Sequence, residues 1–128
     1  SLKRRGAQFV SVIHPKALIS DFCVIGESAI VYRSSSLSIN VKIGDFAILL
    51  DSGIGHDVII GDYFSIASCC AVGGYVVFGN NVLVGSGAVI MPNKKIGDDS
   101  RIGTGSVVVR DVKPRTSVFG NPAKVLKF

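Results

Sequence analysis

The stretch from Ile54 to Val108 reads IGHDVI IGDYFS IASCCA VGGYVV FGNNVL VGSGAV IMPNKK IGDDSR IGTGSV V. An aliphatic or aromatic residue opens each hexapeptide, and glycine follows it in most of them. The period also runs back toward the N-terminus, with one step of five residues between Leu49 and Ile54. The apolar positions of the period are Ile13, Ile19, Ile25, Val31, Leu37, Ile43, Leu49, Ile54, Ile60, Ile66, Val72, Phe78, Val84, Ile90, Ile96, Ile102 and Val108. A fixed period over this length predicts a repeat architecture.

The hexapeptides predict an all-β fold made of coiled parallel strands. Four residues after each aliphatic the side chain is mostly small or β-branched, so each short strand points one large and one small side chain inward and then turns a corner. Hairpins would need longer alternating strands and two-residue turns. Three hexapeptides per coil give about five to six triangular coils, each packed on its neighbours. The predicted ladders are Ile54, Val72, Ile90 and Val108; Ile60, Phe78 and Ile96; and Ile66, Val84 and Ile102.

The 128 residues are enough for one domain. We expect a connector over residues 1–12, the β-helix over 13–113, and an irregular C-terminal tail over 114–128 that packs on the coil. One irregularity falls inside the predicted coil, because the pattern turns Lys94 inward. Pro92 beside it indicates a local distortion of that corner.

The composition and charge of the chain limit the classes of function that it can have. No run approaches about 18 consecutive apolar residues, so we predict no membrane span, and the basic first residues lack the apolar core of a signal peptide, so we expect a cytoplasmic protein. The net charge is +5, but the basic residues of the last third are dispersed, so we expect no nucleic-acid partner. A smaller anionic ligand such as a phosphorylated cofactor is the alternative. Cys23, Cys69 and Cys70 fit no disulfide framework, and we expect reduced thiols with Cys69 pointing outward.

His56, followed by Asp57, is the candidate catalytic residue. It falls on an outward position beside the five-residue step, and imidazole is the side chain best suited to take a proton near neutral pH. An adjacent carboxylate fixes the tautomer of such a base. The alternative is an ordinary surface histidine. His14, the second histidine, is expected to cap the entry to the coil, and two histidines more than two coils apart predict no metal centre.

Four phrases carry a resemblance to a known family: IGHDVIIGD at 54–62, VGSGAVI at 84–90, IGTGSVV at 102–108 and GNPAK at 120–124. They resemble the hexapeptide-repeat acyltransferases, and more narrowly the sugar O- and N-acetyltransferases of the NeuD and PglD type. This resemblance implies a left-handed parallel β-helix that forms a homotrimer and binds acetyl-CoA between subunits. It also implies that residues 2–10 are the connector after an amino-terminal nucleotide-sugar-binding domain.

The resemblance further implies the chemistry of the site. His56 would be the general base, oriented by Asp57, and a backbone N–H near Gly74 would stabilise the oxyanion. The acceptor would be an amine or hydroxyl of a sugar or nucleotide-sugar, of the sialic acid or UDP-amino-sugar type. The pantetheine arm would pass Gly85, Ser86 and Thr104, and Ser65 stands where some relatives carry a second histidine that contacts the cofactor. Two alternatives stay open: an acyltransferase acting on a non-sugar acceptor such as serine, and a non-catalytic trimeric module.

Overall fold

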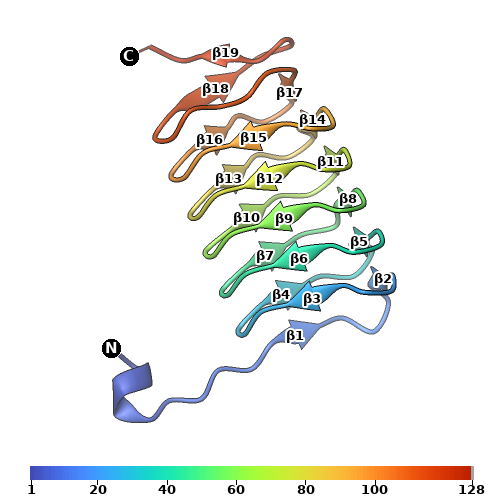
Figure 1. The fold of residues 1–128 in the computed structure, drawn as a ribbon, viewed down its shortest axis with the longest axis vertical. Coiled ribbons are helices and arrows are strands. Elements are labelled where there is room, and N and C mark those ends of the chain that lie inside the picture. The colour runs from blue at the N-terminus through green and yellow to red at the C-terminus, as the bar shows by residue number, and fades with distance from the viewer. Residues whose placement is uncertain (128) are drawn as a thin grey trace.

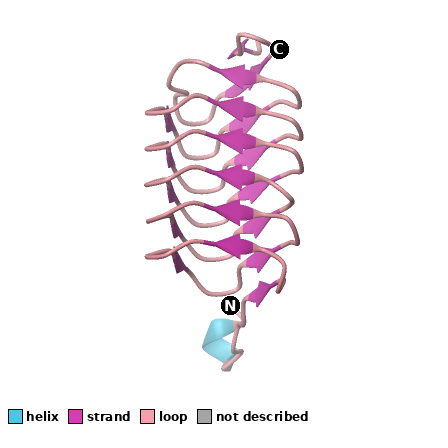
Figure 2. Cartoon of the chain, turned by 90° about the vertical axis from the view of Figure 1, so that its right-hand side faces the viewer, coloured by secondary structure: helices cyan, strands magenta, loops and turns pink. Residues whose placement is uncertain are grey.

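Most of the protein is a stack of coils in which two-residue parallel strands alternate with corners, as described for residues 1–127 in a computed structural model (Figure 1). The strands form three sheets that enclose a triangular prism of about six turns (Figure 2). Sheet A contains β1 (Val12–Ile13), β4 (Ile30–Val31), β7 (Ile48–Leu49), β10 (Ser65–Ile66), β13 (Leu83–Val84), β16 (Arg101–Ile102), β18 (Ser117–Phe119) and β19 (Lys124–Val125). Sheet B contains β2 (Leu18–Ile19), β5 (Ser36–Leu37), β8 (Gly53–Ile54), β11 (Ala71–Val72), β14 (Val89–Ile90) and β17 (Val107–Val108). Sheet C contains β3 (Val24–Ile25), β6 (Lys42–Ile43), β9 (Ile59–Ile60), β12 (Val77–Phe78) and β15 (Lys95–Ile96).

The predicted all-β coil of parallel strands is confirmed. Each apolar position of the hexapeptide period is the second residue of a strand from β1 to β17. Ile54 pairs with Val72, Val72 with Ile90, and Ile90 with Val108, as the ladder prediction required. The large and small inward side chains of successive coils fill the prism as one hydrophobic cluster, which is continuous from Leu37 to Val118.

The corners between strands use a left-handed backbone at their third residue. The φ angle there is +60° at Asn40, +58° at Asp57 and +61° at Tyr75, and glycine takes this place at Gly87 and Gly105. Because the corner repeats in every coil, residues in equal corner positions stack in columns parallel to the prism axis. The outward polar side chains are therefore ordered in columns as well.

The five-residue step before Ile54 is a corner shortened by one residue, and Ser52 completes it. Ser52 is buried, and its Oγ donates to the carbonyl of Ala67 at 2.6 Å while accepting the N–H of Cys70 at 3.1 Å. A side-chain oxygen thus takes over a bond that the backbone makes in the other coils. The step changes the corner without disturbing the ladder on either side of it.

The inward position occupied by Lys94 is only half-buried, whereas Val76 and Val112 occupy the same position in the adjacent coils and are buried. The backbone stays in register there, because the N–H of Val77 donates to the carbonyl of Lys94 at 2.9 Å. Lys94 therefore departs from the inward pattern in its side chain and not in its main chain.

The two ends of the prism differ. Within the predicted connector, η1 (Lys3–Arg5) precedes an extended segment that leads into β1. Within residues 114–127, for which we predicted a tail, β18 continues sheet A in parallel with β16, and β19 pairs with β18 in an antiparallel manner. Phe128 lies outside the described residues. Among residues 1–127 there is no helix with the length and apolar character needed to cross a membrane.

The cysteines and His14 can also be compared with their predicted states. All three cysteines are free thiols, with Cys70 buried, Cys23 half-buried and Cys69 exposed. His14 accepts the N–H of Lys16 through Nδ1 at 3.1 Å, which is a capping contact at the first corner of the coil.

Candidate active site

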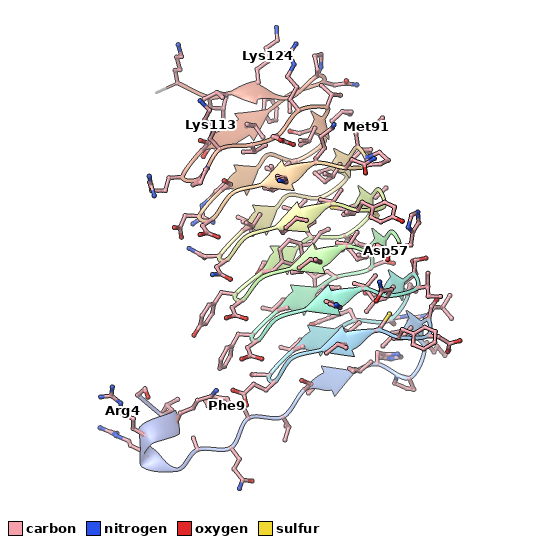
Figure 3. All side chains as sticks on the ribbon, viewed as in Figure 1. Arg4, Phe9, Asp57, Met91, Lys113 and Lys124 are labelled. Atoms are coloured by element: carbon pink, nitrogen blue, oxygen red, sulfur yellow. The ribbon has the colours of Figure 1, made fainter. Side chains whose placement is uncertain are left out.

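The edge of the prism that joins sheet B to sheet C carries the candidate catalytic residues. We call the corners at residues 38–41, 55–58 and 73–76 the histidine edge. They place Asn40, Asp57 and Tyr75 in one column, with His56 in the neighbouring column. Figure 3 shows Asp57 on this edge, together with Met91 from a later corner. Hydrogen bonds between coils fix the register, because the N–H of Tyr75 donates to the carbonyl of His56 at 3.0 Å.

Asp57 orients the imidazole of His56. The Nδ1 of His56 lies 2.9 Å from Oδ2 of Asp57, and Asn40 donates its amide N–H to Oδ1 of the same carboxylate at 2.6 Å. The pKa of Asp57 is lowered, and the hydrogen bond from Asn40 is the largest cause. His56 and the side chain of Tyr75 make smaller contributions in the same direction. An ionised Asp57 accepts a hydrogen bond from Nδ1–H of His56, which leaves Nε2 as the free basic nitrogen.

Gly74 lies directly against that free nitrogen. A Cβ on Gly74 would come within 2.6 Å of Nε2 of His56, so any larger residue here would push the imidazole aside. Within residues 1–127, neither Nε2 of His56 nor the N–H of Gly74 has a hydrogen-bond partner. Half of the His56 side chain is exposed. A basic nitrogen and an unused N–H donor thus lie next to each other at the surface, which is the arrangement that acyl transfer requires.

Five residues were predicted to bind the cofactor, and all of them except Gly74 lie elsewhere in the same chain. Gly85, Ser86 and Thr104 belong to the corners that join sheet A to sheet B, and Ser65 lies on sheet A beside Leu83. A cavity of about 280 Å³ is lined by Leu83, Gly85 and Thr104, and Arg101 and Leu126 also contribute to its wall. The structure therefore brings His56, Asp57 and Gly74 together on one edge and places the other four residues on a different side of the prism.

Two positively charged residues line a further cavity at the C-terminal end. Arg110 and Lys124 contribute to the wall of a space of about 220 Å³ next to β17 and β18. Lys113 and Lys124 point away from the body at this end of the prism (Figure 3). Phosphate groups could be held here by charge-assisted hydrogen bonds.

Nowhere among residues 1–127 do three or more histidine, cysteine, aspartate or glutamate side chains gather in a way that would hold a metal ion.

Sequence reasoning missed Asn40 and Tyr75. Both lie one coil away from Asp57, 17 residues before it and 18 after it, and the shortened corner accounts for the difference. Counting one coil in each direction from Asp57 would have found them. Their contacts with Asp57 and His56 depend on the left-handed corner, which turns the three side chains along one column.

The coiled hexapeptides and this edge define a hexapeptide-repeat protein of the acetyltransferase type. The chain belongs to the family described as the GMPPB C-terminal domain, which matches residues 8–104. This membership and the relatives below confirm the resemblance to hexapeptide-repeat sugar acetyltransferases.

Among its relatives is the GDP-perosamine N-acetyltransferase of Escherichia coli O157:H7, 37% identical over 133 residues that cover 99% of this chain and 60% of the relative. The crystal structure of PerB from Caulobacter crescentus, in complex with CoA and GDP-perosamine, is 32% identical, has a TM-score of 0.95, and covers 98% of this chain and 61% of that one. The acetyltransferase domain of PglB from Neisseria gonorrhoeae, in complex with acetyl coenzyme A, is 25% identical with a TM-score of 0.90, covering 97% of this chain and 61% of that one. The chain thus spans about three fifths of these relatives.

Proposed function

We propose that this chain is the β-helix of an acetyltransferase that moves an acetyl group from acetyl-CoA to the amino group of a nucleotide-linked sugar. The observation that carries the proposal is the pairing of His56 with Asp57 on an edge where Nε2 and the N–H of Gly74 are both unused. The relatives add support, because two of them are GDP-perosamine N-acetyltransferases and PerB holds CoA with GDP-perosamine. In two further complexes of the perosamine N-acetyltransferase from Caulobacter crescentus a histidine has been substituted.

The proposed reaction needs a base and an oxyanion donor. Nε2 of His56 takes a proton from the acceptor amine while the nitrogen attacks the thioester carbon of acetyl-CoA. Negative charge then develops on the thioester oxygen, and the N–H of Gly74 donates to it. When the carbon–sulfur bond breaks, the proton held by His56 passes to the leaving thiolate, which yields free CoA and the acetamido sugar. Asp57 stays ionised and stabilises the imidazolium between the two steps.

The separation of the two groups of residues supports a site between subunits. The histidine edge and the cavity beside Gly85 and Thr104 lie on different sides of one prism. In a homotrimer the histidine edge of one subunit would meet the sheet A side of its neighbour, and the acetyl group would reach His56 across that groove. Apolar side chains on the outer faces favour such an assembly, because Ile48 is 37% exposed and Leu83 is 42% exposed. We also propose a cytoplasmic location, which the three free thiols support.

Serine is the second acceptor to consider. A serine acetyltransferase of Synechococcus elongatus is 40% identical over 91 residues, which cover 62% of this chain and 37% of the relative. A serine acetyltransferase of Mycobacterium tuberculosis matches 98% of this chain at 33% identity, below the 37% of the GDP-perosamine N-acetyltransferase over a similar length. This difference in identity supports the amino sugar as the first candidate.

The test is the release of CoA from acetyl-CoA, followed with a thiol reagent, in the presence of a panel of acceptors. The panel contains GDP-linked and UDP-linked amino sugars, sialic acid and serine. We expect release with a nucleotide-linked amino sugar for the native protein and for His14→Asn, and a large loss for His56→Asn. Release with serine alone would move the protein to the second class. If the protein is trimeric by light scattering but binds no CoA in calorimetry, the chain is a non-catalytic module.

A further inference from the structure

Tyr75 is a residue of the histidine edge to which neither the sequence nor the relatives assign a role. It occupies the same corner position as Asp57, one coil further along the axis, with φ of +61° against +58°. The side chain is 56% exposed, so packing in the core does not explain it. The rings of Tyr75 and His56 are perpendicular, at 90°, with their centroids 5.1 Å apart. Edge-to-face contact at this distance is attractive for aromatic rings.

The position of the tyrosine limits where the imidazole can go. Gly74 lies beside the imidazole from the next coil, where an added Cβ would come within 2.6 Å of Nε2, and Tyr75 follows it in the chain. The N–H of Tyr75 donates to the carbonyl of His56 at 3.0 Å, so the tyrosine backbone is held by the residue whose ring it contacts. Asp57 holds the imidazole through Nδ1. The ring therefore has contacts on three sides and keeps its exposed side for a substrate.

The carboxylate of Asp57 also has a polar side chain beside it in each neighbouring coil. Asn40 reaches it from the preceding coil through a 2.6 Å hydrogen bond. The side chain of Tyr75 lies on the following coil and makes the smallest of the contributions that lower the pKa of Asp57. Asn40, Asp57 and Tyr75 thus form a column of three polar side chains that is parallel to the prism axis.

We infer that Tyr75 is a positioning residue for acetyl transfer: its ring fixes the plane of the His56 imidazole, and its hydroxyl holds the Asp57 carboxylate toward Nδ1. The inference rests on the proposed function for its effect on rate, but the arrangement itself can be tested without any substrate. Tyr75 takes no proton and touches no reacting atom. Its removal lets the imidazole rotate away from the acceptor, so the effect falls on kcat more than on KM.

The prism supplies a matched control at Tyr63. This residue also holds the third position of a corner, with φ of +56° and 60% exposure, but it lies on the edge between sheets C and A. Its ring stacks on Phe46 at 5.1 Å and is not paired with a histidine. Replacing Tyr63 therefore changes a corner tyrosine without changing the histidine edge.

The experiment combines NMR titration of the Asp57 side-chain carboxyl with steady-state kinetics for Tyr75→Phe, Tyr75→Ala, Tyr63→Phe and Tyr63→Ala. We expect Tyr75→Phe to raise the pKa of Asp57 and to lower kcat about threefold to tenfold, as for the loss of one hydrogen bond. Tyr75→Ala should lower kcat further with KM nearly unchanged, and phenylalanine should restore part of that loss. Both Tyr63 variants should match the native protein.

An unchanged pKa of Asp57 in Tyr75→Phe would overturn the inference, and so would a Tyr75→Ala variant whose loss lies entirely in KM. If the protein transfers no acetyl group at all, the proposed function fails while the titration still decides the role of the hydroxyl. If Tyr75→Ala does not fold, Tyr75→Phe decides both readouts.

Discussion

The histidine edge and the edge between sheets C and A have the same corner geometry, but their polar side chains differ in the hydrogen bonds that they make. We call the second one the aspartate edge, formed by the corners at residues 26–29, 44–47, 61–64, 79–82 and 97–100. There Asp62 accepts the N–H of Asp45 at 2.8 Å, and Asn80 accepts the N–H of Asp62 at 2.8 Å. Each side-chain oxygen satisfies a backbone donor of the preceding coil.

On the histidine edge the equivalent backbone donor is left over. Gly74 follows His56 in the column, and its N–H has no partner among residues 1–127, while Nε2 of His56 is also unused. The comparison shows that a corner stabilises the fold when its polar atoms bind each other. The same corner becomes available for chemistry when the residue one coil later has no acceptor side chain: Pro92 stands there and leaves the N–H of Gly74 free beside Nε2 of His56.

The largest expected effects come from substituting the second residue of a corner, which is His56 on the histidine edge and Asp62 on the aspartate edge. His56→Asn should lower kcat/KM by about 10² to 10⁴-fold, which is the usual contribution of a general base. Its free energy of unfolding should stay within about 0.5 kcal/mol of native, because the side chain is half exposed. Asp62→Ala should do the reverse, losing about 1.5 kcal/mol of stability with the same kcat/KM. Equal activity in native protein and His56→Asn, measured by CoA release, would contradict this assignment.

Gly74→Ala should have the next largest effect. The added Cβ would come within 2.6 Å of Nε2 of His56 and displace the ring, with an expected loss of about 10²-fold in kcat. Gly53→Ala is the control, because a Cβ there would meet its nearest atom, Oγ of Ser36, at an ordinary 3.5 Å. The two variants are compared by kinetics and by urea unfolding. A Gly74→Ala enzyme with native kcat would show that the close approach of Gly74 has no part in the reaction.

Ser52→Ala tests the shortened corner next to the histidine edge. The change removes the hydrogen bond to the carbonyl of Ala67 and leaves the buried N–H of Cys70 without its acceptor, for a loss of about 1–3 kcal/mol in the free energy of unfolding. Ser35→Ala should lose less, because Ser35 makes one weaker bond, to the carbonyl of Leu49 at 3.3 Å. If both serine variants unfold at the same urea concentration, Ser52 does not complete the corner.

Asn40→Ala should have the smallest effect, visible mainly as a dependence on pH. The hydrogen bond from Asn40 is the first cause of the lowered pKa of Asp57, so that pKa should rise in the variant. A lowered folded pKa stabilises the protein above the unfolded pKa of about 4, and this stabilisation is lost as the pH falls through the folded value. The difference in stability between native protein and Asn40→Ala should therefore be largest near neutral pH and vanish in acid. A difference that grows in acid would contradict the assignment.

Much of the fold could be predicted from the sequence, because the hexapeptide period determines both strand positions and register. The pairing of Ile54 with Val72 follows from counting three hexapeptides, and the structure has it. The role of Ser52 could not be read from the same count, since a missing residue can be absorbed at any point of a corner. Only the folded coil shows which buried oxygen replaces the lost backbone bond.

The candidate site was predictable in its chemistry and less so in its geometry. His56 and Asp57 are adjacent in sequence, so their contact could be expected, whereas Tyr75 meets them only because the left-handed corner aligns successive coils. The sequence of one chain does not predict how His56 and Gly85 come to act on the same substrate. One prism places them on different sides, so it is the assembly, and not the chain, that would bring them to one substrate.

The most direct measurement is a crystal structure of the His56→Asn protein with CoA and a nucleotide-linked amino sugar, since a slow variant would retain both ligands. The account predicts that the sugar nitrogen lies about 3 Å from the substituted side chain and that the CoA sulfur lies beside Gly74. It also predicts that the pantetheine arm follows Gly85 and Thr104 of a neighbouring subunit. Ligands bound along the aspartate edge, with the histidine edge facing solvent, would contradict the central claim.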